Sequence, residues 1–414
     1  DFFVLGEWSE LEVLTNMDGA GDLYINDIRM APGERVGRYF HAIPIEIRAV
    51  PRPGYRLVGW EGDSTAEKLV ISLDGDSAVT ALFEKNSASE IPAEIERRFA
   101  LKKENSPYYA AGDIRVRKGA VLEVEPGVEI QMPERGSLYI EGRLEILGSE
   151  DDPVRILPNA SSGAQQWGAL CFVESSDTST VRHLYLRNAS RGADPLNQLA
   201  AISALNSHLV LDHIDIAAVD FPIFVRGGSV VLQNSRLHAD ATSDYINVKG
   251  GSALSQNNVF VGNDAPDTDG IDYDGVVDGI IRDNIFYNFA GSNSDAIDIG
   301  EQAQNILIAG NRIFNISDKG VSVGQHSTVR LENNVILECN MGIAVKDSSY
   351  AFIDKNTFYG NGIAVACFEK NIGQWGGRAD VLNSILASSS QQATLVDEYS
   401  ELNVRYSLAN TAAL

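Results

Sequence analysis

Aspartates and lysines return at matched positions in five segments of the second half of the chain, and these residue types at this spacing could do chemistry. Aligned on their apolar residues, the segments begin at Asp244, Asp269, Asp295, Lys319 and Met341. Side chains alternate across a strand, so the third and fifth residues after each start are expected to point away from the core together. One exposed column then holds Asn247, Asp272, Asp298 and Ser322, and the column beside it holds Lys249, Asp274 and Lys346.

Carboxylates held one strand spacing apart repel each other, so at neutral pH they need a cation, a lysine or a shared proton. Calcium takes oxygen ligands from carboxylates, amides and water, and residues 267–274 contain four aspartates. The glycine spacing and the closing glutamate of an EF-hand are missing. Two interpretations of these aspartates stay open: a solvated acidic turn with no bound ion, and a site for calcium as a cofactor. The predicted ligands are Asp269, Asp272, Asp274, Asp295, Asp298 and Glu301.

Seven asparagines recur roughly every 25 residues, and this period indicates which elements position the aspartates and lysines. They are Asn234, Asn258, Asn284, Asn311, Asn334, Asn356 and Asn383. Such a period marks a solenoid, and the short alternating runs between Gly, Asn, Asp and Ser are strand and turn chemistry. Equivalent strands lie about 4.8 Å apart, so each amide can bond to the next, and asparagine tolerates a left-handed turn. We expect an all-β, right-handed parallel β-helix in which these asparagines are structural.

Bulk composition narrows the classes of partner. The 414 residues carry a net charge of −24, whereas a nucleic-acid protein needs a basic stripe. No run of 18 or more apolar residues is present, so we expect no membrane insertion. A polyanionic glycan would need local lysines, arginines or bridging cations. The start at Asp1, without methionine or signal peptide, suggests a piece of a longer multidomain chain.

Residues 1–85 differ from the rest and predict a small β-rich module, followed by a linker or N-terminal cap over 86–106 and the β-helix over 107–414. Two alternating strands, 54–62 and 79–84, carry aromatic residues that can close a small core. The Gly-Tyr strand, the Gly-Trp-Glu-Gly turn and the Val-Thr-Ala-Leu-Phe strand resemble the internalin-type B-repeat of bacterial surface proteins.

The layout as a whole resembles the region that follows the kinase-like domain in secreted bacterial proteins of the spore-coat protein H type. The segments that carry this resemblance are EPGVEI at 125–130, WGAL at 167–170, GIAVKDSS at 342–349 and NTFYGN at 356–361. The resemblance implies an accompanying module, secreted or at the cell surface, and no known activity. Kinase motifs are missing from the chain.

The β-helix is also similar to pectate-lyase-like enzymes, which place an acidic-polysaccharide cleft on this face. Lyase chemistry needs a cation or arginine to neutralise the uronate carboxyl and a base to remove the C5 proton. Lys249 and Lys346 are the candidate bases. Alternatively, Lys249 forms an exposed ion pair with Asp272 or Asp274 that contributes little to stability. The candidate substrate-binding residues are Asn247, Tyr245, Tyr273 and Lys319.

A second resemblance, to polygalacturonases, concerns successive coils. Their Asn-Thr-Asp, Asp-Asp, Gly-His-Gly and Arg-Ile-Lys motifs correspond to residues 267–269, 294–295, 318–320 and 344–346. One carboxylate of the pair, the histidine and the arginine are missing here. Hydrolysis needs an acid and a base flanking the bond, so the activity is not carried over.

Three hypotheses follow from different classes. The first is an extracellular polysaccharide-binding or surface-display module, stabilised by calcium. The second is a calcium-assisted lyase that acts on uronate-containing glycans. The third is a structural spacer or adhesin stalk, which would need neither exposed aromatics nor bases.

Overall fold

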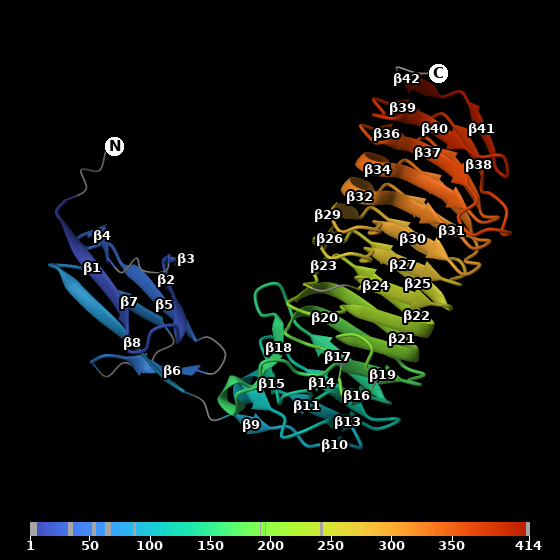
Figure 1. Cartoon of the computed structure of the whole chain (residues 1–414). Coiled ribbons are helices and arrows are strands. Elements are labelled where there is room, and N and C mark those ends of the chain that lie inside the picture. Colours follow the sequence, from blue (N-terminus) through green and yellow to red (C-terminus); the bar gives the residue numbers. More distant parts are fainter. Residues whose placement is uncertain are drawn as a thin grey trace. The chain divides into compact units, whose positions relative to one another are not determined.

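The computed structural model describes residues 6–31, 36–51, 55–62, 68–85, 88–190, 192–194, 196–240 and 243–410. The chain forms two compact units (Figure 1). One unit comprises residues 1–89 with 103–108, and the other comprises 90–102 with 109–414. Within the described residues, no helix is both long enough and apolar enough to cross a membrane.

The first unit is built from two four-stranded sheets. One has the order β4 (Val36–Phe40), β1 (Trp8–Thr15), β8 (Ser77–Lys85) and β6 (Tyr55–Trp60). The other has the order β3 (Ile28–Arg29), β2 (Gly21–Ile25), β5 (Ile45–Pro51) and β7 (Lys68–Ile71). The two predicted strands pair antiparallel as β6 and β8, and Trp60 and Phe83 lie in the core, each 2% exposed. Gly54 of the predicted strand lies outside the described residues.

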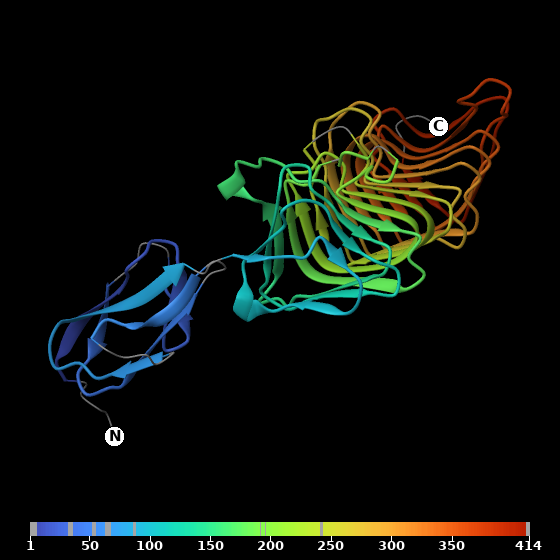
Figure 2. The ribbon, with the colours of Figure 1, turned by 90° about the horizontal axis from the view of Figure 1, so that it is seen from below.

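The second unit is a right-handed parallel β-helix of about 13 turns, as the sequence predicts. Its coils stack into three parallel sheets (Figures 1 and 2). Long strands bend from one sheet into the next: β20 (Thr178–Arg187), β21 (Ile202–Ala217), β22 (Ile223–Gln233), β32 (Arg312–Val323) and β34 (Val335–Lys346). Sheet 1 contains parts of β21, β22, β32 and β34 together with β10 (Glu94–Ile95), β13 (Ile114–Val116), β16 (Leu138–Ile140), β19 (Leu170–Val173), β24 (Ile246–Lys249), β27 (Ile271–Asp274), β30 (Ile297–Gly300), β37 (Ile363–Phe368) and β40 (Gln392–Val396).

The other two sheets complete each coil. Sheet 2 contains parts of β20, β21 and β22 together with β11 (Phe99–Leu101), β14 (Val121–Val124), β17 (Arg143–Leu147), β25 (Ser252–Gln256), β28 (Ile280–Arg282), β31 (Ile306–Ala309), β33 (Thr328–Glu332), β35 (Tyr350–Asp354), β38 (Arg378–Leu382) and β41 (Glu401–Arg405). Sheet 3 contains parts of β20, β21, β32 and β34 together with β12 (Tyr108–Tyr109), β15 (Glu129–Met132), β18 (Val154–Pro158), β23 (Arg236–Leu237), β26 (Val259–Val261), β29 (Ile285–Phe289), β36 (Thr357–Tyr359), β39 (Ile385–Ala387) and β42 (Leu408–Asn410). The remaining elements are β9 (Ser89–Glu90) and two 3-10 helices, η1 (Lys103–Asn105) and η2 (Ala160–Ser162).

The β-helix begins earlier than the predicted residue 107. Strands β10 and β11 pair in parallel with β13 and β14 of the next coil, so part of the predicted 86–106 linker or cap is the first coil. These strands have two and three residues, which is too short for an alternating pattern to show.

The asparagine ladder is confirmed at five of the seven predicted positions, from Asn258 to Asn356. Each of these side chains is at most 1% exposed. The Oδ1 of Asn284 accepts from the backbone N–H of Asn258 at 2.9 Å and from its Nδ2 at 3.0 Å, and the later pairs repeat this contact. The ladder satisfies a buried backbone donor in each of these coils.

At both ends of the ladder the prediction is wrong by one residue. Ser235 and Ser384 occupy the ladder position, bonded to Asn258 and Asn356 respectively. Asn234 and Asn383 lie one residue earlier, with φ of 52° and 49°. They therefore supply the left-handed turn that comes before the ladder, because asparagine tolerates that backbone.

Candidate functional site

The polar face of sheet 1 lies on strands β24, β27, β30, β32 and β34, and we call it the ladder face. Its registers pair Asn247 with Asp272, Asp272 with Asp298 and Asp298 with Ser322. The predicted alignment of coils is therefore correct. Three columns result: the Asp244 column of Asp244, Asp269, Asp295 and Lys319; the Asp272 column of Asn247, Asp272, Asp298 and Ser322; and the Lys346 column of Lys249, Asp274, Gly300, Gly324 and Lys346.

In the Asp244 column, each carboxylate accepts a hydrogen bond from the backbone of the next coil. The distances are 3.2 Å to the N–H of Asp269, 2.6 Å to that of Asp295 and 2.9 Å to that of Lys319. Burial raises the pKa of Asp244 and raises that of Asp269 well above its usual range. Burial also raises the pKa of Asp295 to about 6, against the opposing charge of Lys319.

Two lysines of the ladder face form ion pairs with carboxylates. The Lys249 Nζ bonds to Asp274 at 2.5 Å and lies 3.7 Å from Glu301. Burial lowers the pKa of Lys249, but the hydrogen bond and charge of Asp274 outweigh burial and raise it overall. Lys319, 5% exposed, bonds to Asp295 at 3.2 Å and to Asp318 at 2.5 Å. Its pKa is likewise raised, because those carboxylates outweigh the effect of burial.

Asn247 and Asp272 form a third polar group. The Asn247 Nδ2 donates to Asp244 at 2.9 Å and to Asp272. Among the described residues its buried Oδ1 accepts no hydrogen bond. Burial raises the pKa of Asp272 to about 9, and the charges of Asp274 and Asp244 add to that rise. This raised pKa favours the protonated form of Asp272 at neutral pH.

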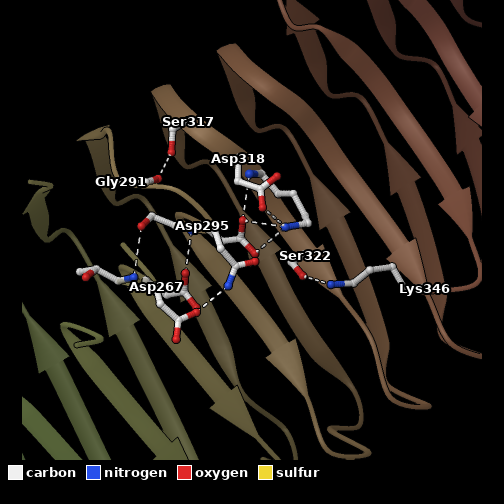
Figure 3. Close-up of polar contacts among 12 residues, drawn as sticks. Asp267, Gly291, Asp295, Ser317, Asp318, Ser322 and Lys346 are labelled. Carbon is white, nitrogen blue, oxygen red and sulfur yellow. Dashed lines mark hydrogen bonds and ion pairs between the residues drawn. The ribbon is translucent and has the colours of Figure 1, made fainter. Parts of the chain in front are cut away.

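Lys346 and Asp298 remain without an ionic partner among the described residues. Lys346 is 4% exposed, and its Nζ donates to the Ser322 Oγ at 2.7 Å (Figure 3). Burial lowers the pKa of Lys346; the charge of Asp298 opposes this shift, and the charges of Lys319 and Lys370 add to it. Burying an ammonium without a counter-charge is expensive, so Lys346 is the least easily explained residue of the face.

Two glycines leave room between Asp274 and Lys346 in their column. A Cβ added at Gly300 would lie 2.7 Å from the Asp274 Oδ1, and one at Gly324 would lie 3.5 Å from the Lys346 Cε. The two side chains therefore lean over the glycine coils that separate them. The Gln325 Oε1 also lies 2.6 Å from the Cβ position of Gly300, so the side chains of Asp274, Gln325 and Lys346 fill the space over the two glycines.

The prediction that Tyr245 and Tyr273 bind substrate is wrong, because both side chains are 0% exposed. The Tyr245 hydroxyl donates to the Val261 carbonyl at 2.6 Å, and the Tyr273 hydroxyl bonds to Ser255 at 2.8 Å. Tyr273 is the register partner of Val248, which also points inward. Both tyrosines therefore belong to the core.

The predicted calcium ligands lie together on the ladder face and at its rim. Among the described residues, no three His, Cys, Asp or Glu side chains converge as ligands for a metal ion. Asp274 and Asp295 are neutralised by lysines, and Asp272 accepts from an amide. Asp298 keeps its carboxylate free of such contacts, and Glu301 lies at the exposed rim of the face.

Asp244, Asp318 and Ser322 contribute to the site although the sequence reasoning gave them no role. Figure 3 shows Asp318 beside Asp295 and Ser322 facing Lys346. Asp244 and Ser322 stand at aligned positions of the five segments, so the alignment itself was a signal for both. Asp318 precedes Lys319 and becomes relevant only through its ion pair with that residue.

Comparisons with known proteins agree with the fold. Residues 221–386 match the model of the right-handed β-helix region family, and residues 33–87 match the divergent InlB B-repeat domain. The predicted B-repeat resemblance is thereby confirmed, whereas the link to spore-coat protein H-type proteins stays a prediction. No curated protein matches the chain.

Solved structures with likeness to this chain include β-helix enzymes. The A-module of a mannuronan C-5 epimerase from Azotobacter vinelandii is 11% identical with a TM-score of 0.45, over 78% of this chain and 91% of that chain. A periplasmic alginate epimerase is 13% identical with a TM-score of 0.44, over 75% and 87%. A PL6 family polysaccharide lyase from Pseudopedobacter saltans is 11% identical with a TM-score of 0.34, over 73% and 94%. Likeness at these levels carries nothing about activity or substrate.

Proposed function

We propose that the ladder face binds a polysaccharide containing uronate residues and cleaves it by β-elimination, with Lys346 as the base. The observation that carries this proposal is a lysine that is 4% exposed, bonded to Ser322 and, among the described residues, without a carboxylate partner. A display module or a spacer gains nothing from such a residue, because an unpaired buried charge lowers stability. A base must be free of a counter-charge and must give up its proton readily.

In the elimination step, a proton leaves C5 of the uronate ring and the glycosidic oxygen leaves C4. The neutral amine of Lys346 takes the C5 proton, and the electrons of that C–H bond form the C4–C5 double bond. The bond from C4 to the glycosidic oxygen breaks with its electron pair. The ammonium formed on Lys346 can return the proton to that oxygen, which leaves an unsaturated uronate and a new chain end.

Asp272 supports a second role. It lies three coils from Lys346, so it would meet the carboxylate of a neighbouring uronate unit. A carboxylic acid that its surroundings keep neutral can donate a hydrogen bond there. The pKa of Asp272, raised by burial to about 9, meets this requirement. The lowered pKa of Lys346 and the raised pKa of Asp272 favour the neutral form of both groups, as proton abstraction and this hydrogen bond respectively require.

The test is incubation with polygalacturonate, alginate and a glycosaminoglycan, followed by near-ultraviolet absorbance of unsaturated uronate and by a reducing-end assay. Elimination raises both signals together. We expect this result on at least one polymer, and its loss in Lys346→Met. A rise of neither signal on any uronate polymer would remove the proposed lyase activity.

Hydrolysis is a second candidate, favoured by the pairing of Asp272 with Asp298 in adjacent coils. Strands of adjacent coils lie about 4.8 Å apart, close to the roughly 5 Å between carboxyls in retaining glycosidases. Asp272 would be the acid and Asp298 the nucleophile. New reducing ends without ultraviolet absorbance would support this candidate over elimination.

A polysaccharide-binding or display role at the cell surface is the outcome if a glycan binds but stays intact. Secretion and the setting beside a spore-coat protein H-type kinase remain proposals from the sequence motifs. Calcium is also a separate proposal: Asp272 and Asp298 from adjacent coils could share a divalent ion once Asp272 loses its proton. No step of the elimination described above depends on that ion.

A further inference from the structure

Trp375 is displayed on a loop at the edge of the ladder face. The loop covers residues 369–377, between β37 and β38. Its tryptophan is 67% exposed, and Tyr399 beside it is 49% exposed. The centroids of the two rings lie 6.3 Å apart and their planes meet at 78°. Two accessible aromatic rings therefore form a corner on the surface.

The loop is held in one shape by two carboxylates. The Asp347 Oδ1, on a residue 2% exposed, accepts from the backbone N–H groups of Lys370 and Asn371, each at 2.9 Å. The Glu369 Oε1 accepts from the N–H groups of Gly373 and Trp375, each at 2.8 Å. Trp375 has a φ of 62°, a left-handed backbone that a bulky residue rarely adopts. The backbone of Trp375 is thus held in a conformation that this residue rarely adopts.

The loop runs beside Lys346. The backbone N–H of Ser348, two residues after Lys346, donates to Gly376 at 3.1 Å, and its hydroxyl donates to the Gln374 carbonyl at 2.6 Å. The Gln374 side chain reaches back to the His326 Nε2 at 3.2 Å. His326 stands two residues after Gly324, the residue over which Lys346 leans. The loop therefore follows the edge of the face on the side of the proposed base.

We propose that Trp375, with Tyr399, is a stacking platform for a sugar ring of the same glycan whose neighbouring unit lies at Lys346. This inference rests on the proposed function, because it takes the glycan to lie on the ladder face. The C–H face of a pyranose ring is apolar, and an aromatic side chain removes it from water over a large area. Glu369 is a positioning residue, since it holds the backbone of Trp375.

The test is calorimetric binding of polygalacturonate and alginate oligosaccharides to full chains that carry Lys346→Met, so that binding is measured without turnover. Trp375→Gly removes the ring and suits the left-handed backbone, so folding is retained. Tyr406→Gly is the matched control, because Tyr406 is an exposed aromatic of the same unit with a φ of 52°. Glu369→Ala and Glu369→Gln test the positioning role, since glutamine keeps the acceptor oxygen.

We expect Trp375→Gly to weaken binding about tenfold, Trp375→Tyr to retain most of it, and Tyr406→Gly to leave it unchanged. Glu369→Ala should weaken binding, and Glu369→Gln should restore it. Equal affinity of Trp375→Gly and its parent overturns the platform, as does a parent that binds none of the oligosaccharides. If Trp375 contributes to binding but the chain with its native Lys346 produces no unsaturated uronate, only the proposed lyase activity is contradicted.

Discussion

The Lys346 Nζ donates a hydrogen bond to the Ser322 Oγ, one coil back, at 2.7 Å. This contact bends the lysine over Gly324, and the residue is 4% exposed. A hydroxyl can orient an amine in either protonation state, whereas a carboxylate would favour the charged form. The pairing thus positions Lys346 without raising its pKa, as a base requires.

Lys346→Met is expected to reduce elimination at least about 100-fold, because general base catalysis contributes that much or more. The measurement is the initial rate of ultraviolet absorbance on the polymer that the wild type cleaves. Lys355→Met is the control: this lysine is exposed and pairs with Asp354 at 3.2 Å on another sheet. Full activity in Lys346→Met would mean that another group is the base, and Lys249 would be the first candidate.

The rate of elimination should depend on pH in a bell shape. Activity rises with pH as Lys346 loses its proton, below the usual lysine range, since burial and the charges of Lys319 and Lys370 outweigh Asp298 and Asp295. It falls above about pH 9 as Asp272 ionises. Asp272→Asn keeps a donor but does not titrate, so its alkaline decline should vanish. An unchanged alkaline decline in that variant would exclude Asp272 as the donor.

Asp272 should also weaken the fold as pH rises. Its pKa is about 9 in the folded chain and near 4 when unfolded. The unfolded state therefore binds fewer protons between these values, and stability is lost as pH increases across them. Asp272→Asn should be more stable than the wild type by about 1 kcal/mol or more at pH 8, and equal to it near pH 4. The measurement is chemical denaturation at both pH values. A difference in stability between the variant and the wild type that widens toward acid pH would contradict the prediction.

Substitutions in the asparagine ladder should lower the free energy of unfolding far more than substitutions at the neighbouring turn positions. Asn311→Ala removes the acceptor of two Asn284 donors and the donor to Ile281, and it leaves buried groups unpaired. We expect a loss of about 3 kcal/mol or more in the free energy of unfolding. Asn234→Ala, at the exposed turn position, should cost about 1 kcal/mol. Equal losses in urea denaturation would mean that the ladder bonds contribute little.

Calcium binding can be decided by thermal melting with calcium and with a chelator, at pH 7 and at pH 9.5. If the ion binds between Asp272 and Asp298, calcium should raise the melting temperature more at the higher pH, where Asp272 is ionised. Asp298→Asn should abolish the effect. Melting curves that are the same with calcium and with chelator at both pH values would exclude calcium.

The repeat architecture was determined by the sequence itself. A buried strand position must be apolar in every coil, and a buried ladder donor needs a polar partner one coil away, so both requirements repeat at one-coil intervals along the chain. That periodicity placed Asn247, Asp272 and Asp298 in one column, and it placed Lys249 beside Asp274. Local alternation was sufficient because coil stacking converts equivalent positions into neighbours.

Only the tertiary structure decided how the charges are distributed among partners. Lys249 and Lys346 look equivalent as lysines at the same strand position, yet one is neutralised by Asp274 and the other leans over a glycine toward a serine. The predictions for Tyr245 and Asn234 were wrong for a related reason. A bend or a one-residue offset at a corner changes whether a side chain faces the core, and side-chain contacts between coils determine that choice.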